Sequence, residues 1–266
     1  MDSSSLSDLE IRDAVSAAAS IAREAGDYLL TRFGVARVAY RKASLDDVLD
    51  ADVESERLIL TRLQADFPEF CILSEEAGLV GAERSIRWIV DPLDGSVNFQ
   101  RGLPVFAVSI ALAAGKSILA GVTYLPMLDE LYTAIRGKGA GLNGETIAVS
   151  QTAVLEEAVI HIGELERTGP DTVSTEQLAE LTRVAHLARR IRLVGSSSAD
   201  LAAVASGRAD ALIMHGGEPW DVAAGNLLVR EAGGAITTLR YENGMTLTTY
   251  SNKLLHTRLT DLLRIG

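Results

Sequence analysis

The sequence has a single cysteine, Cys71, which excludes an internal disulfide and a metal site built on cysteine ligands. Its four histidines are scattered and lack the spacing of zinc ligands. No apolar run approaches the roughly 18 residues of a membrane span, and the first residues have neither the basic nor the apolar segment of a signal peptide. We therefore expect an unprocessed, soluble protein of the reducing cytoplasm.

Positive charge is also scarce. The chain has 25 Lys and Arg residues against 36 Asp and Glu residues, a formal net charge of −11, and its cations form no cluster in the sequence. Such a chain is a poor direct ligand for nucleic acid or for an anionic membrane. A small phosphorylated substrate stays compatible with this charge if a metal ion offsets the repulsion.

Apolar residues make up 47% of the chain, enough for a sizeable core. Their periodicity predicts helices over 8–32 and 53–66 and strands over 70–74, 86–90, 106–113 and 117–124. The glycine-rich stretch GKGAGLNGETIAVS, residues 137–150, is predicted to be a loop. Strands over 159–162, 191–194, 209–214 and 235–239 then alternate with helices over 175–188, 199–205 and 221–232. We expect an α+β half over 1–145 and an α/β half over 146–266.

Carboxylates collect where the predicted elements begin or end. Asp46, Asp52 and Glu56 surround the start of the second helix, and Glu75 and Glu76 follow a strand. Asp91 and Asp94 follow another strand in RWIVDPLDGSVNF, and Asp221 opens a helix in PWDVAAGNLLVREAGG.

Each group of carboxylates has an ordinary alternative: a helix start, an exposed loop or an Asp-Pro-x-Asp-Gly turn. Several such coincidences are less plausible than one shared site. Oxygen ligands without histidine or cysteine suit Mg²⁺, and two such ions can activate a water and stabilise a leaving oxygen in phosphoryl transfer. The residues themselves therefore predict a magnesium-dependent phosphatase.

At these residues the sequence resembles the inositol monophosphatase family. WIVDPLDGSVNF resembles the family signature Asp-Pro-Leu/Ile-Asp-Gly-Thr/Ser-x-Asn-Phe, and PWDVAAGNLLVREAGG resembles its second signature, Trp-Asp-x-Ala-Ala-Gly. The resemblance covers roughly residues 8–260, and the motifs together are highly specific. It implies a layered αβαβα sandwich that forms a homodimer and hydrolyses a small phosphate ester with two or three Mg²⁺ ions.

The resemblance also implies a role for each matching residue. Glu75, Asp91 and the Leu93 carbonyl would hold one ion, and Asp91, Asp94 and Asp221 would hold the other. Gly95 and Ser96 would offer backbone N–H groups to the phosphate, and the Ser96 hydroxyl, paired with Asp52, would orient and deprotonate the attacking water. Glu76, Lys42 and Asp46 would support the ligands from behind, and Gly195, Ser196 and Ser197 would contact the polyol side of the substrate.

The sequence departs from the family pattern at a position that is expected to contact the substrate. Members that act on inositol phosphates carry a glutamate seven residues before the aspartate of the second signature, and this chain has Met214 there. A methionine cannot accept a hydrogen bond from a ring hydroxyl as a carboxylate does, unless Glu218 or His215 takes its place. Residues 163–172 are expected to form part of the substrate rim.

Several functions stay open at this point. The first is a phosphomonoesterase for a cyclitol or sugar phosphate. The alternatives are a phosphatase for 3′-phosphoadenosine 5′-phosphate, histidinol phosphate or fructose 1,6-bisphosphate, or a regulatory or binding protein on the same fold.

Overall fold

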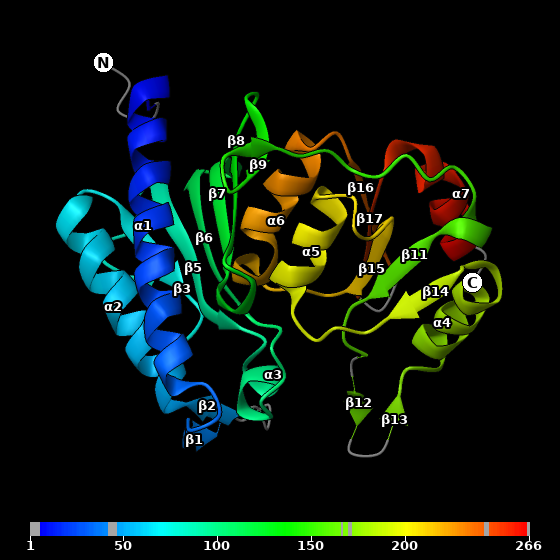
Figure 1. The fold of residues 1–266 in the computed structure, drawn as a ribbon, viewed down its shortest axis with the longest axis horizontal. Coiled ribbons are helices and arrows are strands. Elements are labelled where there is room, and N and C mark those ends of the chain that lie inside the picture. Colours follow the sequence, from blue (N-terminus) through cyan, green and yellow to red (C-terminus); the bar gives the residue numbers. More distant parts are fainter. Residues whose placement is uncertain (1–5, 42–46, 166, 170–171, 242–244, 265–266) are drawn as a thin grey trace.

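The computed structural model describes residues 6–41, 47–165, 167–169, 172–241 and 245–264. Its helices and sheets form five layers (Figure 1). Helices α1 (Asp8–Arg32) and α2 (Asp50–Asp66) cover the outer face of a first sheet. Helices α5 (Ser197–Ala205) and α6 (Pro219–Glu231) lie between that sheet and a second one, whose outer side carries α4 (Thr175–Leu187) and α7 (Lys253–Arg264). The expected αβαβα sandwich is confirmed.

The first sheet has eight strands in the order β10-β9-β8-β7-β6-β5-β3-β4. Their bounds are β3 Cys71–Ser74, β4 Gly78–Val80, β5 Ile86–Asp94, β6 Ala107–Ala114, β7 Ser117–Leu125, β8 Glu130–Ile135, β9 Gly139–Leu142 and β10 Glu145–Thr146. All neighbours pair antiparallel except β3 and β5. That parallel pair brings the carboxyl ends of β3 and β5 to the same edge of the sheet.

The second sheet has five strands in the order β14-β11-β15-β17-β16. Their bounds are β11 Val159–Ile162, β14 Arg190–Arg192, β15 Ala211–His215, β16 Ala235–Arg240 and β17 Thr246–Ser251. Two small pairs complete the strands, β1 (Val38–Arg41) with β2 (Asp47–Leu49) and β12 (Arg167–Gly169) with β13 (Thr172–Val173). A short helix, α3 (Ser96–Gln100), follows β5 directly.

The predicted helices and strands are present with shifted bounds, such as 190–192 for the strand expected over 191–194, and β8 was not predicted. Further corrections concern β5, the glycine-rich stretch and the second sheet. The strand expected to stop at Val90 continues to Asp94. The stretch expected to be a loop, residues 137–150, contains β9 and β10, which Asn143 and Gly144, both at positive φ, join in a tight hairpin. In the second sheet, β17 and the closing helix α7 were not predicted, and β17 pairs antiparallel with both of its neighbours.

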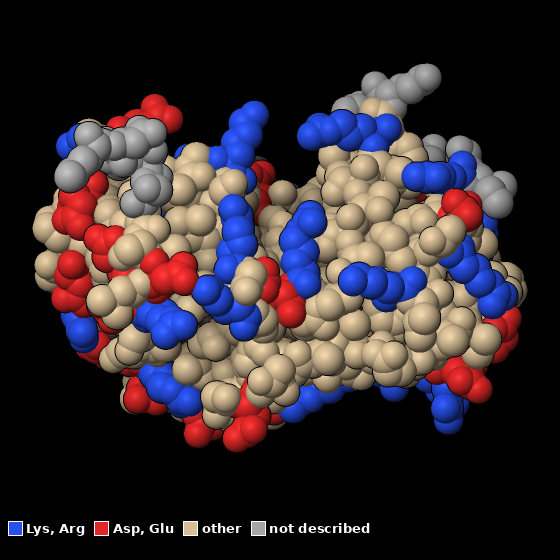
Figure 2. All heavy atoms as spheres, turned by 90° about the horizontal axis from the view of Figure 1, so that it is seen from above, with Lys and Arg blue, Asp and Glu red and all other residues tan. Residues whose placement is uncertain are grey.

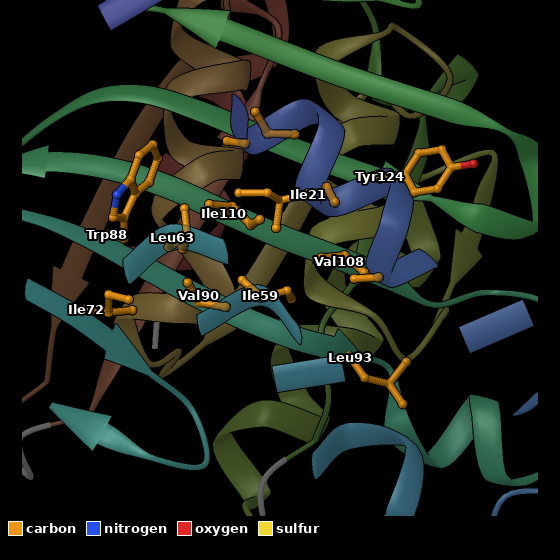
Figure 3. Packing of buried hydrophobic residues seen from close by; sticks show 14 of the residues in the cluster. Ile21, Ile59, Leu63, Ile72, Trp88, Val90, Leu93, Val108, Ile110 and Tyr124 are labelled. Carbon is orange, nitrogen blue, oxygen red and sulfur yellow. The ribbon is translucent and has the colours of Figure 1, made fainter. Parts of the chain in front are cut away.

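The first core lies between the outer helices and the first sheet. Figure 3 shows Ile21 of α1 and Ile59 and Leu63 of α2 packed against residues of β5 and β6. Trp88 and Leu93, at the two ends of β5, are each 1% exposed in this core. Burying a large apolar side chain contributes about 1.5–3 kcal/mol, so β5 is fixed along its whole length.

Helix α6 lies unusually close to its neighbours. A Cβ atom at Gly225 would come within 2.3 Å of Leu201 on α5, and one at Gly121 of β7 would come within 2.9 Å of the Ala224 backbone. Glycine at both positions therefore allows α6 to approach α5 and the first sheet. None of the helices in the part of the chain described here is long and apolar enough to cross a bilayer.

We expect Gly225→Ala to lower the free energy of unfolding by about 1–3 kcal/mol, because the new methyl group overpacks the contact with Leu201. Elsewhere in a helix interior the same change stabilises by about 0.5–1 kcal/mol, so the sign tests the contact. Urea denaturation measures it. Leu201→Ala costs stability by itself, but it should remove most of the additional penalty of Gly225→Ala in the double variant.

Candidate functional site

A cavity of about 510 Å³ opens where β3, β5 and the first turns of α2, α3, α5 and α6 meet. Most of the residues singled out from the sequence line it: Asp52, Glu75, Glu76, Asp91, Leu93, Asp94, Gly95, Ser96, Gly195, Ser196, Ser197, Met214, His215, Glu218 and Asp221. Lys42 and Asp46 lie outside the described residues, and Glu56 does not line the cavity. The fold thus brings together residues from much of the sequence.

A β-bulge shapes the end of β5. Asp91 faces Ser109 and Asp94 faces Ala107, so three residue steps on β5 match two steps on β6. Pro92, which cannot donate a ladder hydrogen bond, sits inside this irregularity. Its carbonyl accepts a hydrogen bond of 2.8 Å from the Ser55 hydroxyl on α2. The Asp-Pro-Leu-Asp stretch is therefore a bulged strand tied to α2, and it turns only at Gly95.

Gly95 is required by both conformation and space. Its φ of 92° lies in the left-handed region, and a Cβ there would come within 3.0 Å of the Val105 carbonyl. Three residues later, the Asn98 amide donates at 2.8 Å to the carbonyls of both Val105 and Val194. Asn98 therefore clamps the start of α3 to the loop that precedes α5. The sequence motif contains Asn98, but nothing in the motif predicted this contact.

The loop that carries Glu75 and Glu76 is held by Glu56 of α2. The Glu56 Oε1 atom accepts hydrogen bonds from the Ser74 hydroxyl at 2.5 Å, from the Glu76 N–H at 3.2 Å and from the Ala77 N–H at 3.0 Å. Glu56 is 8% exposed and does not line the cavity. Its buried carboxylate is fully engaged in fixing the turn after β3, a role that its place in an acidic run did not reveal.

Backbone N–H groups hold the remaining carboxylates. Asp52 accepts from the Leu49 N–H at 2.7 Å, Asp91 from the Leu93 N–H at 3.1 Å, and Asp221 from the Glu218 N–H at 2.8 Å. Asp94 accepts from the N–H groups of Ser197, at 3.2 Å, and of Ser198, at the start of α5. Hydrogen bonds of this kind favour the charged form and partly offset the repulsion among the carboxylates.

Burial and crowding nevertheless raise the pKa values of Asp52, Asp91 and Asp94. Burial raises the pKa of Asp52 to about 7 against its hydrogen bond from Leu49, and Glu75 and Glu76 add to the rise. Burial also raises the pKa of Asp94 to about 7 despite the hydrogen bonds from Ser198.

Asp91, which is 2% exposed, has its pKa raised well above the usual value by burial and then by Asp94, Glu75 and Asp221. The negative charge of the carboxylates in this cavity therefore has to be neutralised by protons or by a cation.

The donor set fits a hard divalent cation. It consists of carboxylate oxygens and peptide carbonyls, the ligands that Mg²⁺ and Ca²⁺ prefer. In the described part of the chain, no three Asp, Glu, His or Cys side chains already converge on one point as the ligands of a bound ion do. The hydrogen bonds that hold the carboxylates on neighbouring backbone account for this spread.

The Ser96 hydroxyl and the Asp52 carboxylate both line the cavity. Within the described residues no hydrogen bond joins them, and the Asp52 carboxylate accepts instead from Leu49.

On the far wall of the cavity, Met214 takes the place where a carboxylate was expected for inositol. It is 6% exposed, and it packs so closely that a Cβ at Gly217 would come within 2.8 Å of its terminal methyl group. His215 is paired through Nε2 with Glu180 at 2.6 Å, and Glu218 is exposed at the rim. This wall is therefore apolar at its centre.

Gly163 and Glu164, from the expected substrate rim, line the cavity as well, and so do residues that the sequence analysis did not assign to the site: Asp47, Val97, Asp200, Gly217 and Trp220. Asp200 of α5 is 1% exposed and lies 2.5 Å from His161 Nδ1 on β11. The spacing of Asp200 relative to the apolar residues of α5 did not indicate that its side chain would line the cavity. Only the packing of α5 against β11 brings it to the cavity.

Comparisons with known proteins agree with this geometry. The family model described as "Inositol monophosphatase family" matches residues 10–262. Inositol-1-monophosphatase of Mesorhizobium japonicum is 39% identical over 240 residues, which are 90% of this chain and 87% of that protein. Nus factor SuhB of Escherichia coli K12 is 37% identical and covers 81% of each chain. The crystal structure of extragenic suppressor protein suhB from Bartonella henselae superposes with a TM-score of 0.86 at 36% identity, covering 96% of this chain and 99% of that one.

The raised pKa values predict how stability depends on pH in the absence of metal. Asp52 and Asp94 hold protons in the folded chain up to pH about 7, whereas their usual value is 3.8. The folded state therefore binds more protons than the unfolded state across this range, and in EDTA the free energy of unfolding should fall as the pH rises from 5 toward 8, by on the order of a few kcal/mol.

Added Mg²⁺ should reverse this loss, and it should raise the melting temperature more at pH 8 than at pH 5 because protons compete for the same carboxylates. Differential scanning fluorimetry in matched buffers measures both effects, with NaCl of equal ionic strength as the control. A melting temperature that does not fall with pH in EDTA, or that NaCl restores as well as Mg²⁺, would contradict the interpretation.

Proposed function

Since the chain belongs to the inositol monophosphatase family and is a phosphoric monoester hydrolase, we propose that it hydrolyses a small cyclitol or sugar phosphate at the cavity described above, with bound Mg²⁺. One observation carries the proposal: α2, the loop after β3, β5 and α6 bring Asp52, Glu75, Asp91, Asp94 and Asp221 to one cavity. Unpaired charges gathered at one point destabilise a fold unless a cation joins them, which supports a metal site.

Two ions would be held by overlapping ligand sets. Glu75, Asp91 and the Leu93 carbonyl would hold one, and Asp91, Asp94 and Asp221 would hold the other. The resemblance to the family also allows a third ion. When bound, the ions would neutralise the carboxylates and stabilise the charge that develops on the phosphate and the leaving oxygen. Glu76, Lys42 and Asp46 would support these ligands.

The chain itself would position the reacting groups. The backbone N–H groups of Gly95 and Ser96 would hold the phosphate, in keeping with the positive φ that opens the backbone at Gly95. The Ser96 hydroxyl would orient the attacking water, and Asp52 would accept its proton, a role that suits a carboxylate whose pKa is raised by burial. Gly195, Ser196 and Ser197 would contact the polyol through the loop that Asn98 clamps.

The nature of the substrate depends on the wall opposite the phosphate. Met214 makes this wall apolar, and an inositol ring would leave a hydroxyl without its acceptor there, at a cost of about 1–3 kcal/mol. We therefore expect a substrate with fewer hydroxyls on this side than myo-inositol 1-phosphate. Fructose 1,6-bisphosphate, 3′-phosphoadenosine 5′-phosphate and histidinol phosphate are the alternatives.

A regulatory role is a second candidate. The Escherichia coli relative is described as a Nus factor, which supports a binding function beside hydrolysis on this fold. Such a function would survive the loss of the metal site, so a variant without hydrolysis separates the two candidates.

We also expect a homodimer. Val97 of α3 and the nearby Leu103 and Leu193 are 57%, 52% and 55% exposed, and Asn98 ties α3 to the segment that contains Leu193. Together they offer apolar surface for a second copy, which sedimentation of the purified chain would detect.

Asp94 is a proposed metal ligand, and it also accepts hydrogen bonds from the start of α5. Replacing it by Asn removes its negative charge. We expect Asp94→Asn to abolish the rise in melting temperature with Mg²⁺ and to lower kcat for phosphate release at least about 100-fold. Phosphate release with Mg²⁺ and with EDTA measures the second effect. Asp13→Asn, the same change at an exposed position of α1, should behave as the wild type. Undiminished hydrolysis by the Asp94 variant would contradict the proposed metal ligands.

Met214→Glu should restore the missing acceptor. We expect it to raise the ratio of kcat/KM for inositol 1-phosphate to that for glycerol 2-phosphate about tenfold, whereas Met214→Leu, which stays apolar, should leave the ratio unchanged. The measurement is one panel of phosphate release that also includes the alternative esters. A wild-type chain that already prefers inositol 1-phosphate over the whole panel would overturn this role for Met214.

A further inference from the structure

A second cavity, of about 430 Å³, lies at the end of the first sheet opposite the candidate site. Its lining comes from Lys116 in the turn between β6 and β7, from Ser117 and Ile118 at the start of β7, from Arg136 after β8, and from the last turns of α6 (Asn226, Leu227, Arg230, Glu231). The two cavities share no lining residue. The strand registers place them at opposite ends, because Ile86 at the start of β5 pairs with Ala114 and Asp94 at its end pairs with Ala107.

The charge of this second cavity is opposite to that of the whole chain. It has three cations, Lys116, Arg136 and Arg230, and one carboxylate, that of Glu231. Figure 2 looks onto this end of the molecule and shows Lys and Arg side chains gathered in the middle of the face around a smaller acidic patch. In a chain of net charge −11 this is a local excess of positive charge.

The cations of the cavity are not neutralised by the protein. Among the described residues none of Lys116, Arg136 and Arg230 takes part in an ion pair. The Glu231 carboxylate is engaged elsewhere: it accepts hydrogen bonds from the Gly137 N–H at 2.8 Å and the Gly139 N–H at 2.9 Å. Its charge therefore fixes the turn between β8 and β9 and is not paired with a cation.

Helix chemistry explains only part of this arrangement. A cation in the last turn of a helix complements the helix dipole, which accounts for Arg230 on α6. It does not account for Lys116 and Arg136, which come from two other elements. The buried Asn226 Oδ1 atom also has no hydrogen-bond partner, and turning the amide would present its N–H₂ group in the same place.

We propose that this second cavity binds a small phosphate-bearing anion, apart from the site of hydrolysis. Lys116 and Arg230 would supply the charge, and Arg136, whose guanidinium also donates to the Ile118 carbonyl, would form the fixed wall. Guanidinium and ammonium groups are the usual protein partners of phosphate oxygens. The volume lies within the range of small-ligand sites, which favours a metabolite over a polymer.

Binding of inorganic pyrophosphate to the intact chain in EDTA tests the proposal by isothermal titration calorimetry. Without metal the carboxylates of the candidate site repel this anion, so binding reports on the second cavity. We expect one site per chain in the wild type, and an affinity at least tenfold weaker in the double variant Lys116→Gln/Arg230→Gln. Arg136→Gln alone, as a second variant, should also weaken binding.

The matched control is Arg189→Gln/Lys253→Gln, which removes two exposed cations that do not line the cavity. It should bind pyrophosphate as the wild type does. The proposal is overturned if the wild type does not bind at millimolar pyrophosphate, if all chains bind equally, or if the control loses as much affinity as the test variant. Melting temperatures of the variants, all changed at exposed residues, verify that each is folded. Because no metal or substrate is present, failure here leaves the proposed hydrolysis untouched.

Discussion

The repulsion among carboxylates is the constraint around which the molecule is built. Asp91, at 2% exposure, lies within the influence of Asp94, Glu75 and Asp221, and such an arrangement is unfavourable unless protons or cations enter it. The fold offsets part of the cost with backbone N–H groups from the first turns of α2, α5 and α6. The remaining negative potential favours protons or a cation in the cavity, which supports the proposed metal site.

The rest of the architecture keeps these charges in position. The bulge at the end of β5, the glycine that turns the chain into α3 and the Asn98 clamp all act within a few residues of Asp94. Behind them, Leu93 and Trp88 bury β5 in the first core, so that repulsion cannot simply push the strand outward. Glu56, which lies outside the cavity, holds the loop after β3 in place by hydrogen bonds. Apolar burial thus supplies the rigidity that a cluster of like charges needs.

Much of this could be predicted from the sequence. Apolar periodicity predicted the long helix 8–32 to the residue and came within one residue of the bounds of β6 and β7. Of the carboxylates that end or begin elements, Asp52, Glu75, Glu76, Asp91, Asp94 and Asp221 line one cavity as expected, whereas Glu56 does not. The extra length of β5 was missed because a bulge lets proline and aspartate stay in a strand. Asn98, Glu56 and Asp200 were missed as well, since their contacts join segments far apart in the chain and leave no local pattern.

The position of α5 and α6 has a consequence for how the chain emerges from the ribosome. Both helices come late in the sequence, yet Ala223 and Ala224 of α6 cover Ile89 and Ala111 of the first sheet, which is complete at Thr146. During synthesis this apolar face has nothing to cover it until some eighty more residues have been made. The nascent sheet is then open to association with other chains, so a chaperone that shields it would act in this interval.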